Sequence, residues 1–184
     1  MNNHLTESIK KASTRIRLLQ KTRKYLDTKT AILVYNSMIV PLFTYCAFSL
    51  FGATPQYIKS RISHLESRAQ RIIGAPIPKR EEILKKKMCL FVHRCIHKNN
   101  VPNTFENYFK FKNTTMNTRS NGNKLEMPRI KLEAARATFK YQGINLFNSL
   151  GKDVRIETDF NRFRQLIQFF SPLLPITSVT SLSI

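Results

Sequence analysis

The sequence predicts a mainly α-helical bundle with a short β-hairpin and a C-terminal helix. Three observations lead to this prediction. Apolar residues recur at steps of three and four in several separate segments, which is the period of an amphipathic helix. Turn residues mark the boundaries of several of these segments, as Gly52, Gly74, Pro76 and Pro78 do. Residues 31–51 form a long uncharged segment in a chain whose formal net charge is +20, so this segment is expected to be buried.

Residues 5–26 have the pattern of an amphipathic helix. The apolar side consists of Leu5, Ile9, Ala12, Ile16, Leu19 and Leu26, and only Arg23 interrupts it. At about 100° per residue, four basic residues fall together on another side of this helix: Lys10, Arg17, Lys21 and Lys24. No acidic residue lies four positions from these lysines, so they are not paired within the helix. We therefore select the four as nucleic-acid contacts, with an ordinary solvated face as the alternative.

The uncharged segment 31–51 admits two interpretations. A run of about 18 or more apolar residues is long enough to cross a bilayer, which would make the chain a basic membrane-associated protein. Against this, Pro41 lies near its centre and lacks the backbone donor that a continuous helix needs. We therefore favour two short helices, roughly 30–40 and 41–51, buried at the centre of a soluble domain. Asp27 or Thr28 is the expected cap of the first.

A third helix is expected over residues 55–73. Thr54 and Pro55 provide its N-terminal signal and Gly74 its end. The side of this helix that faces the core is expected to carry Ile58, Ile62, Leu65, Ala69 and Ile72. A second stripe, rotated by about 100° around the helix axis from the first, consists of Arg61, His64, Arg68 and Arg71. We select Arg61, Arg68 and Arg71 as phosphate contacts. The alternative is that these arginines only cover the edge of the core.

After a hinge at Pro76 and Pro78, residues 79–98 read as a fourth helix with Leu84, Met88, Val92 and Cys95 inward. Cys89, His93 and His97 stand at steps of four and share one face. Structural zinc usually takes four ligands, and no fourth cysteine or histidine is near in the sequence. We therefore predict no metal site and no cofactor.

The remaining chain predicts a loop at 111–130, short strands at 124–129 and 135–141, and a short helix at 141–150. A final helix has Thr158 as its cap and Phe160, Phe163, Ile167 and Phe170 inward. We expect a helical domain at 1–110, a second segment at 111–170, and a disordered tail at 171–184.

The charge balance indicates the class of partner. Lysine and arginine number 31 against 11 acidic residues, which favours a polyanionic partner, nucleic acid before anionic lipid. Three cysteines without framework spacing suggest a reducing compartment. The first 30 residues contain no apolar segment typical of a signal peptide. We expect an intracellular protein, nuclear or cytoplasmic, that is not secreted.

The sequence shows no catalytic pattern. Its three aspartates, Asp27, Asp153 and Asp159, are widely separated, whereas a two-metal polymerase or nuclease needs clustered carboxylates. Glycine-rich phosphate loops, nucleophile elbows and zinc-protease motifs are absent from the sequence. We therefore expect a binding module without a small-molecule substrate.

Several segments, in chain order, resemble the region that follows the polymerase palm in reverse transcriptases of non-LTR (jockey-like, LINE-class) retrotransposons. They are residues 4–26, 33–46, 64–75, 90–109, 119–129, 138–150 and 160–170. In that family the last part is usually a Phe-x-Tyr-x-Gly-x-x-x-Trp-Asn-Ser-Leu-Pro signature. The matching residues here are Phe139, Tyr141, Gly143, Asn148, Ser149 and Leu150, whereas Phe147 replaces the Trp and Gly151 the Pro.

The resemblance implies a helical thumb-like bundle descended from an RNA-directed DNA polymerase of a transposable element. It implies RNA or an RNA/DNA duplex as the partner, together with the palm of the parent enzyme. The family's Tyr-x-Asp-Asp catalytic strand would precede Met1. We therefore expect a nucleic-acid-binding remnant that does not polymerise.

Overall fold

The computed structural model describes residues 2–45, 52, 54–98, 101–105, 107–112 and 123–169. The fold is mainly helical, as predicted. The chain divides into two compact units, Met1–Leu84 and Lys85–Ile184. This division falls within helix α6 (Arg80–Ile96), whereas the sequence pattern placed a boundary at residue 110. Each unit is described separately below.

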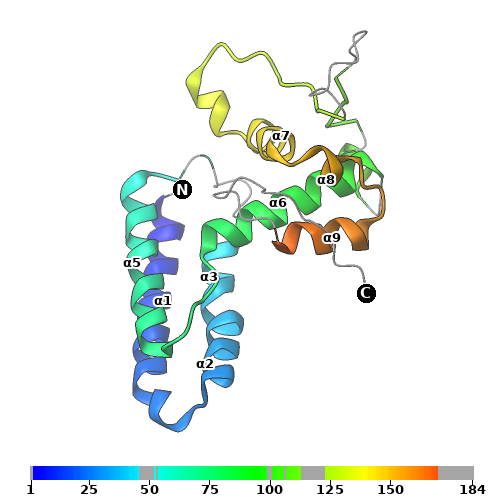
Figure 1. Ribbon diagram of the computed structural model, residues 1–184. Coiled ribbons are helices and arrows are strands. Elements are labelled where there is room, and N and C mark those ends of the chain that lie inside the picture. Colours follow the sequence, from blue (N-terminus) through cyan, green and yellow to red (C-terminus); the bar gives the residue numbers. More distant parts are fainter. Residues whose placement is uncertain are drawn as a thin grey trace, which may run out of the picture. The chain divides into compact units, whose positions relative to one another are not determined.

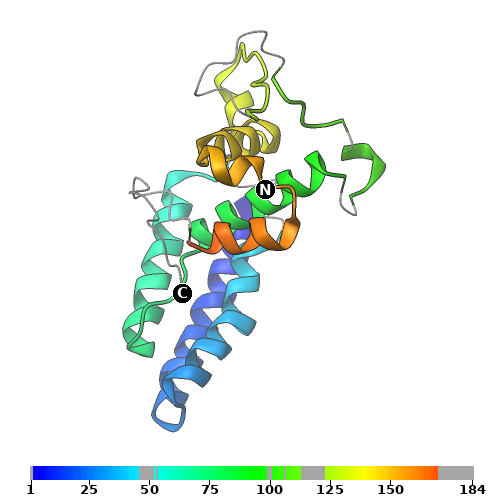
Figure 2. The same ribbon diagram turned by 45° about the vertical axis from the view of Figure 1, so that its right-hand side comes forward.

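The first unit contains three helical rods that lie side by side (Figures 1 and 2). The first rod is α1 (Asn2–Thr22), which ends in a 3₁₀ turn, η1 (Arg23–Tyr25). The second comprises α2 (Thr28–Val34), a π-helical segment η2 (Tyr35–Ile39) and α3 (Val40–Thr44), and the third is α5 (Gln56–Ile73). The second rod runs opposite to α1, and α5 runs in the same direction as α1 (Figure 1).

The core of this unit lies where the three rods face one another. Its buried residues are Leu5, Ile9, Ala12, Ile16, Leu19, Ala31, Tyr35, Ile39, Phe43, Ile58, Ile62, Leu65, Ala69, Ile73 and Ile77. The apolar stripes predicted for α1 and α5 are therefore confirmed. The differences are at the ends of the two stripes. Leu26 is only partly buried and follows η1, and on α5 Ile73 is fully buried whereas the predicted Ile72 is partly buried. Glu66 is also buried on α5; its carboxylate accepts the Arg80 backbone N–H at 2.5 Å.

The helix break predicted at Pro41 is wrong, because the second rod continues through the proline. The Val40 N–H donates to the Tyr35 carbonyl, five residues back, and the π-helical segment places Pro41 in the first turn of α3. Proline's missing N–H costs little there. The Arg15 guanidinium of α1 also donates to the carbonyl of Met38. Residues 46–51 of the predicted second helix lie outside the described residues.

The second rod turns one side into the protein. Ala31, Tyr35, Ile39 and Phe43 stand at steps of four and are all buried in the core of the first unit. None of the helices that the structure describes combines the length and the apolar character needed to cross a bilayer.

The predicted cap of α2 and the predicted C-terminal end of α5 are confirmed. The predicted N-cap of α5 is wrong, because Pro55 and not Thr54 is the N-cap residue and Gln56 is the first helical residue. Asp27 is the cap of α2 and accepts the backbone N–H of Lys29 at 3.1 Å. Hydrogen bonds from the Thr30 side chain and from backbone N–H groups hold the pKa of Asp27 below its usual value. Helix α5 follows Pro55 and ends at Gly74, whose φ of 75° is left-handed and favours glycine.

Arg23, the residue that interrupts the apolar stripe of α1, closes the C-terminal end of α5. Its Nε donates to the Ile72 carbonyl at 3.2 Å, and its Nη2 donates to the Ile73 carbonyl at 2.9 Å. The last carbonyls of a helix have no partner within the helix and carry partial negative charge. A cation that donates to both therefore stabilises α5 and fixes its register against α1.

The second unit contains the remaining part of α6, the 3₁₀ turns η3 (Asn103–Phe105) and η4 (Glu133–Ala137), and helices α7 (Phe139–Ser149), α8 (Lys152–Ile156) and α9 (Phe160–Phe169). Helices α7 and α9 lie on opposite sides of α6 (Figures 1 and 2). The buried core is Cys89, Val92, Cys95, Phe109, Leu125, Ile144, Phe147, Leu150, Phe163 and Ile167. The predicted inward residues of α6 and the helix at 141–150 are confirmed.

The predicted β-hairpin of strands 124–129 and 135–141 is wrong. Residues 135–137 belong to η4 and residues 139–141 to α7, because the Glu-Ala-Ala-Arg-Ala run favours helix. Among the described residues, Leu125 makes one isolated antiparallel bridge, to Phe111. The outer edge of Leu125 is occupied by the Asn148 amide, which accepts the Leu125 N–H at 2.8 Å and donates to its carbonyl at 3.0 Å. A side chain thus takes the place of a neighbouring strand.

The final helix forms as predicted but with a different cap. The Asp159 carboxylate, not Thr158, accepts the backbone N–H of Arg162 at 2.7 Å. Phe163 and Ile167 are buried, and Phe160 is half-buried. Phe170 and the predicted tail at 171–184 lie outside the described residues.

Candidate nucleic-acid interface

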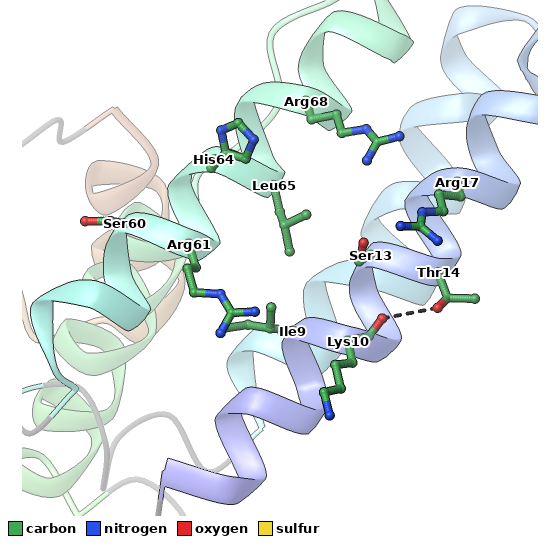
Figure 3. A pocket seen from close by; sticks show the side chains of 10 residues that line it. All are labelled: Ile9, Lys10, Ser13, Thr14, Arg17, Ser60, Arg61, His64, Leu65 and Arg68. Carbon is green, nitrogen blue, oxygen red and sulfur yellow. Dashed lines mark hydrogen bonds between the residues drawn. The ribbon is translucent and has the colours of Figure 1, made fainter.

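A groove of about 640 Å³ lies between α1 and α5 in the first unit (Figure 3). It is lined by Ile9, Lys10, Ser13, Thr14, Arg17, Ser60, Arg61, His64, Leu65 and Arg68. Ile9 and Leu65 belong to the core and form its apolar floor. The four cations come from the two basic stripes that the sequence predicted on separate helices, and the fold brings the two stripes together.

The cations form two rows in register. Lys10 and Arg17 stand seven residues apart on α1, as Arg61 and Arg68 do on α5. Since a helix rises about 1.5 Å per residue, each pair spans about 10 Å along its helix. The two helices run in the same direction, and Figure 3 shows Arg61 and Arg68 reaching from α5 toward α1. The result is an open channel with two positive charges on each side.

Small side chains keep the channel open between these long ones. Ser13 and Thr14 lie between Lys10 and Arg17, and the Thr14 hydroxyl donates back to the Lys10 carbonyl at 3.2 Å. The Ser60 hydroxyl likewise donates to the Gln56 carbonyl at 3.0 Å. These hydroxyls are thus engaged by the helices, so the charged groups dominate the chemistry of the groove.

No acidic side chain lines the groove in the part of the chain that the structure describes. The two acidic residues of its helices are engaged elsewhere: Glu7 pairs with Lys11 at 3.4 Å, and Glu66 is buried and binds the Arg80 backbone. Within the same described part, the Lys10, Arg17 and Arg61 side chains form no hydrogen bond or ion pair. The groove is therefore a concentration of positive charge without internal compensation, which attracts anions.

Arg68 has a second role, because its Nη2 donates to Oε1 of Gln20 on α1 at 3.0 Å. It is half-buried, whereas Lys10, Arg17 and Arg61 are exposed. Arg68 therefore joins the two helices as well as contributing charge. A substitution at Arg61 tests the groove more cleanly than one at Arg68.

Three of the seven predicted contact residues do not line the groove. Lys21 is exposed in the last turn of α1, and Lys24 lies in η1 with its ammonium 4.7 Å from the centre of the Tyr25 ring. Arg71 borders a separate shallow hollow with Ser67 and Gln70. The structure thus brings together Lys10, Arg17, Arg61 and Arg68 and leaves the others on the outer surface.

Sequence reasoning left out four polar residues that line the groove: Ser13, Thr14, Ser60 and His64. His64 was placed on the arginine stripe but not among the contacts. The signal for the other three is their spacing, because Ser13 and Thr14 follow Lys10 by three and four residues and Ser60 precedes Arg61.

The histidine and cysteine side chains of α6 serve the core of the second unit. His93 is fully buried, stacks on Phe163 with ring centres 4.0 Å apart, and its Nε2 lies 2.9 Å from the Glu157 carbonyl oxygen. Burial lowers the pKa of His93 and raises that of the Cys89 thiol to about 12. In the described part of the chain, no three His, Cys, Asp or Glu residues are grouped so that they could hold a metal ion.

Comparison of the chain with protein-family models, with curated proteins and with solved structures gives no match. The function of the groove must therefore be inferred from its own charge, spacing and shape. The resemblance to reverse transcriptases stays a prediction that rests on the sequence segments given above.

Proposed function

We propose that the chain binds nucleic acid through the phosphate backbone, without sequence specificity, in the groove between α1 and α5. The observation that carries this proposal is the pair of cation rows, with four positive charges and no acidic lining residue in the described structure. Phosphate contacts from lysine and arginine supply most of the affinity in sequence-independent binding. Guanidinium groups at Arg17, Arg61 and Arg68 suit phosphate because their donors form a planar fork.

The arrangement favours a linear polyanion over a solvated surface. A surface that only keeps a protein soluble mixes charges of both signs. Here two helices place cations at equal steps of seven residues along a shared channel. Ligands with one phosphate group would leave half of these charges uncompensated, whereas a phosphodiester backbone presents a series of charges along the same line.

We also propose that the chain descends from the thumb-like region of a non-LTR retrotransposon reverse transcriptase. This would make RNA or an RNA/DNA duplex the expected ligand and the palm of the parent enzyme a former partner. The signature residues have structural reasons to be retained. A Cβ on Gly143 would lie 3.0 Å from Cγ2 of Val92, so α7 and α6 pack closely there. Asn148 fixes Leu125, and Phe147 is fully buried.

We expect no polymerase activity from this chain. The aspartates serve separate helix starts: Asp27 caps α2, Asp159 binds the first turn of α9, and Asp153 lies in the first turn of α8. Carboxylates used in this way stabilise helices through the helix dipole and the free N–H groups. Metal-assisted phosphoryl transfer needs carboxylates that converge on the same ions.

The direct test is a salt titration of binding. Purified chain is titrated against a fluorescent RNA/DNA duplex by anisotropy at several salt concentrations. If the four groove cations neutralise about four phosphates, affinity should fall roughly a hundredfold between about 50 and 200 mM salt. An affinity that does not change with salt would exclude backbone binding.

A further inference from the structure

A second hollow, of about 760 Å³, lies in the second unit between α7 and two short extended segments. Its lining includes Phe111, Met127 and Asn145, beside lysines of the same extended segments. The proposed function does not use this hollow. It belongs to a different compact unit from the α1/α5 groove and differs from it by containing an exposed phenylalanine.

The backbone around Phe111 is held on two sides. The Lys112 N–H donates to the Lys124 carbonyl and the Glu126 N–H to the Lys110 carbonyl, both at 2.9 Å. Phe111 lies opposite Leu125, which is 1% exposed and anchored to the core. The Asn148 amide fixes the far edge of Leu125 through both of its backbone groups. The backbone that carries Phe111 is therefore held in place, and the Phe111 side chain can serve as a fixed platform.

Side chains alternate between the two faces of an extended segment. Phe111 thus shares a face with its bridge partner Leu125 and with Met127, and Lys110, Lys112 and Lys124 leave from the other face. The backbones of the two segments lie only about 5 Å apart. The long apolar stems of the lysines can therefore carry their ammonium groups around the edge of the pair toward the face that holds Phe111. An apolar platform and a group of cations therefore border the same hollow.

Phe111 is 44% exposed and Met127 is 38% exposed, although their neighbours Phe109 and Leu125 belong to the buried core of this unit. Asn145 is exposed on α7, one turn before Asn148. Whereas the Asn148 amide is hydrogen-bonded through both its oxygen and its nitrogen, that of Asn145 has no hydrogen-bond partner in the described structure. An exposed phenylalanine, an amide without a partner and nearby lysines match the face of a base, the edge of a base and the phosphates of a nucleotide chain.

We propose that this hollow binds an unpaired nucleotide of single-stranded RNA or DNA. The base stacks on Phe111 and lies against Met127, the Asn145 amide bonds the edge of the base, and the lysines neutralise the adjoining phosphates. Stacking on aromatic rings and a basic surface are the features by which proteins bind single strands. A paired base has both faces covered by its neighbours, so a duplex cannot use the Phe111 platform. Glu126, which also borders the hollow, limits its net charge.

The experiment uses the fact that the chain contains no tryptophan. Phe111→Trp introduces a single tryptophan at the platform, which is excited selectively over the six tyrosines. Leu132→Trp places one at a residue of the same unit that is 72% exposed and does not line the hollow. Short oligouridylate should quench the emission of Phe111→Trp and leave that of Leu132→Trp unchanged. A duplex of the same length should quench neither variant. Absence of quenching at position 111, or equal quenching by the duplex, would overturn the proposal.

Affinity gives a second measurement. It is made in an Arg17→Gln/Arg61→Gln background, which weakens the α1/α5 groove, so failure of one site is distinguished from failure of the other. Phe111→Ala should lower the affinity for oligouridylate about five- to 150-fold. Asn145→Ala, which leaves the platform intact, should also lower it. Thermal melting confirms that each variant is folded, and unchanged affinity in a folded Phe111→Ala variant contradicts the proposal.

Discussion

Leu65 and Arg61 stand four residues apart on α5 and have different roles. Leu65 is 8% exposed and belongs to the core of the first unit, so Leu65→Ala removes buried methyl groups and leaves a cavity. We predict a loss of about 2 to 5 kcal/mol in the free energy of unfolding. Leu18→Ala on α1 is the control, because Leu18 is 55% exposed and its change should stay within about 0.5 kcal/mol. Denaturant unfolding measures both, and equal effects would contradict the assigned core.

Glu66 is a buried acid whose ionisation opposes folding. Burial raises the pKa of Glu66 above its ordinary value of 4.5, although the Arg80 N–H and guanidinium act in the opposite direction. A folded pKa above the unfolded value means that its stabilising contribution is complete below about pH 4.5 and is lost as pH rises through the folded pKa.

The prediction concerns the difference between the wild type and Glu66→Gln, which keeps an acceptor for the Arg80 N–H. The wild type should lose stability relative to this variant as pH rises from about 4 through the folded pKa of Glu66. Thermal melting over a pH series measures the difference. A difference that is constant, or that grows in favour of the wild type, would show that the carboxylate is not disfavoured by burial.

Single residues show what the sequence pattern can and cannot predict. The buried stripes of α1 and α5 follow from helical period, because each depends on residues three and four apart. The role of Arg23 does not, since its acceptors, the Ile72 and Ile73 carbonyls, lie 49 and 50 residues away. From the sequence alone Arg23 is an interruption of the stripe, and only the docking of α5 on α1 supplies its partners.

At the scale of elements, the contact between Arg23 and the end of α5 gives a further prediction. Arg23→Ala should lower the free energy of unfolding by about 2 to 3 kcal/mol, because two charged, partly buried hydrogen bonds to the Ile72 and Ile73 carbonyls are lost. Lys24→Ala removes the same charge from the next, exposed residue and should have an effect within about 0.5 kcal/mol. Denaturant unfolding of the two variants is compared directly. Equal small losses would mean that Arg23 does not hold α5.

Two elements differ from their predictions for reasons outside local sequence. A proline usually breaks a helix, yet the second rod passes Pro41 through a π-helical turn, with an added donor from Arg15 on another helix. The predicted strand at 124–129 stays a single bridge because the Asn148 side chain, 23 residues away, occupies the edge of Leu125. In both cases a side chain distant in the sequence hydrogen-bonds to the local backbone.

At the scale of the whole molecule, the placement of the three aspartates gives a prediction about polymerase activity. We predict no primer extension on RNA or DNA templates with magnesium or manganese, because the three aspartates serve separate helix starts. Incorporation of labelled nucleotide is compared with a mock preparation. Incorporation that disappears on substitution of Asp27, Asp153 or Asp159 would refute this.

The candidate site was predictable in its parts and not in its assembly. Helical period placed basic stripes on α1 and α5, but the shared groove depends on the parallel packing and register of two helices separated by the second rod. This register decides that Lys10, Arg17, Arg61 and Arg68 meet and that Lys21, Lys24 and Arg71 lie elsewhere. The sequence contains no direct signal for such a register, because it is set by core packing over the whole unit.

The central claim, that the α1/α5 groove binds a phosphate backbone, is tested most directly by comparing two substitutions with equal loss of charge. Arg61 lines the groove, whereas Lys59, two residues earlier on α5, is exposed and does not. Duplex binding is measured at several salt concentrations for Arg61→Gln, Lys59→Gln and the wild type. We predict that Arg61→Gln reduces the slope of log affinity against log salt by about one unit and that Lys59→Gln leaves it unchanged. Equal slopes for the two folded variants would contradict the claim.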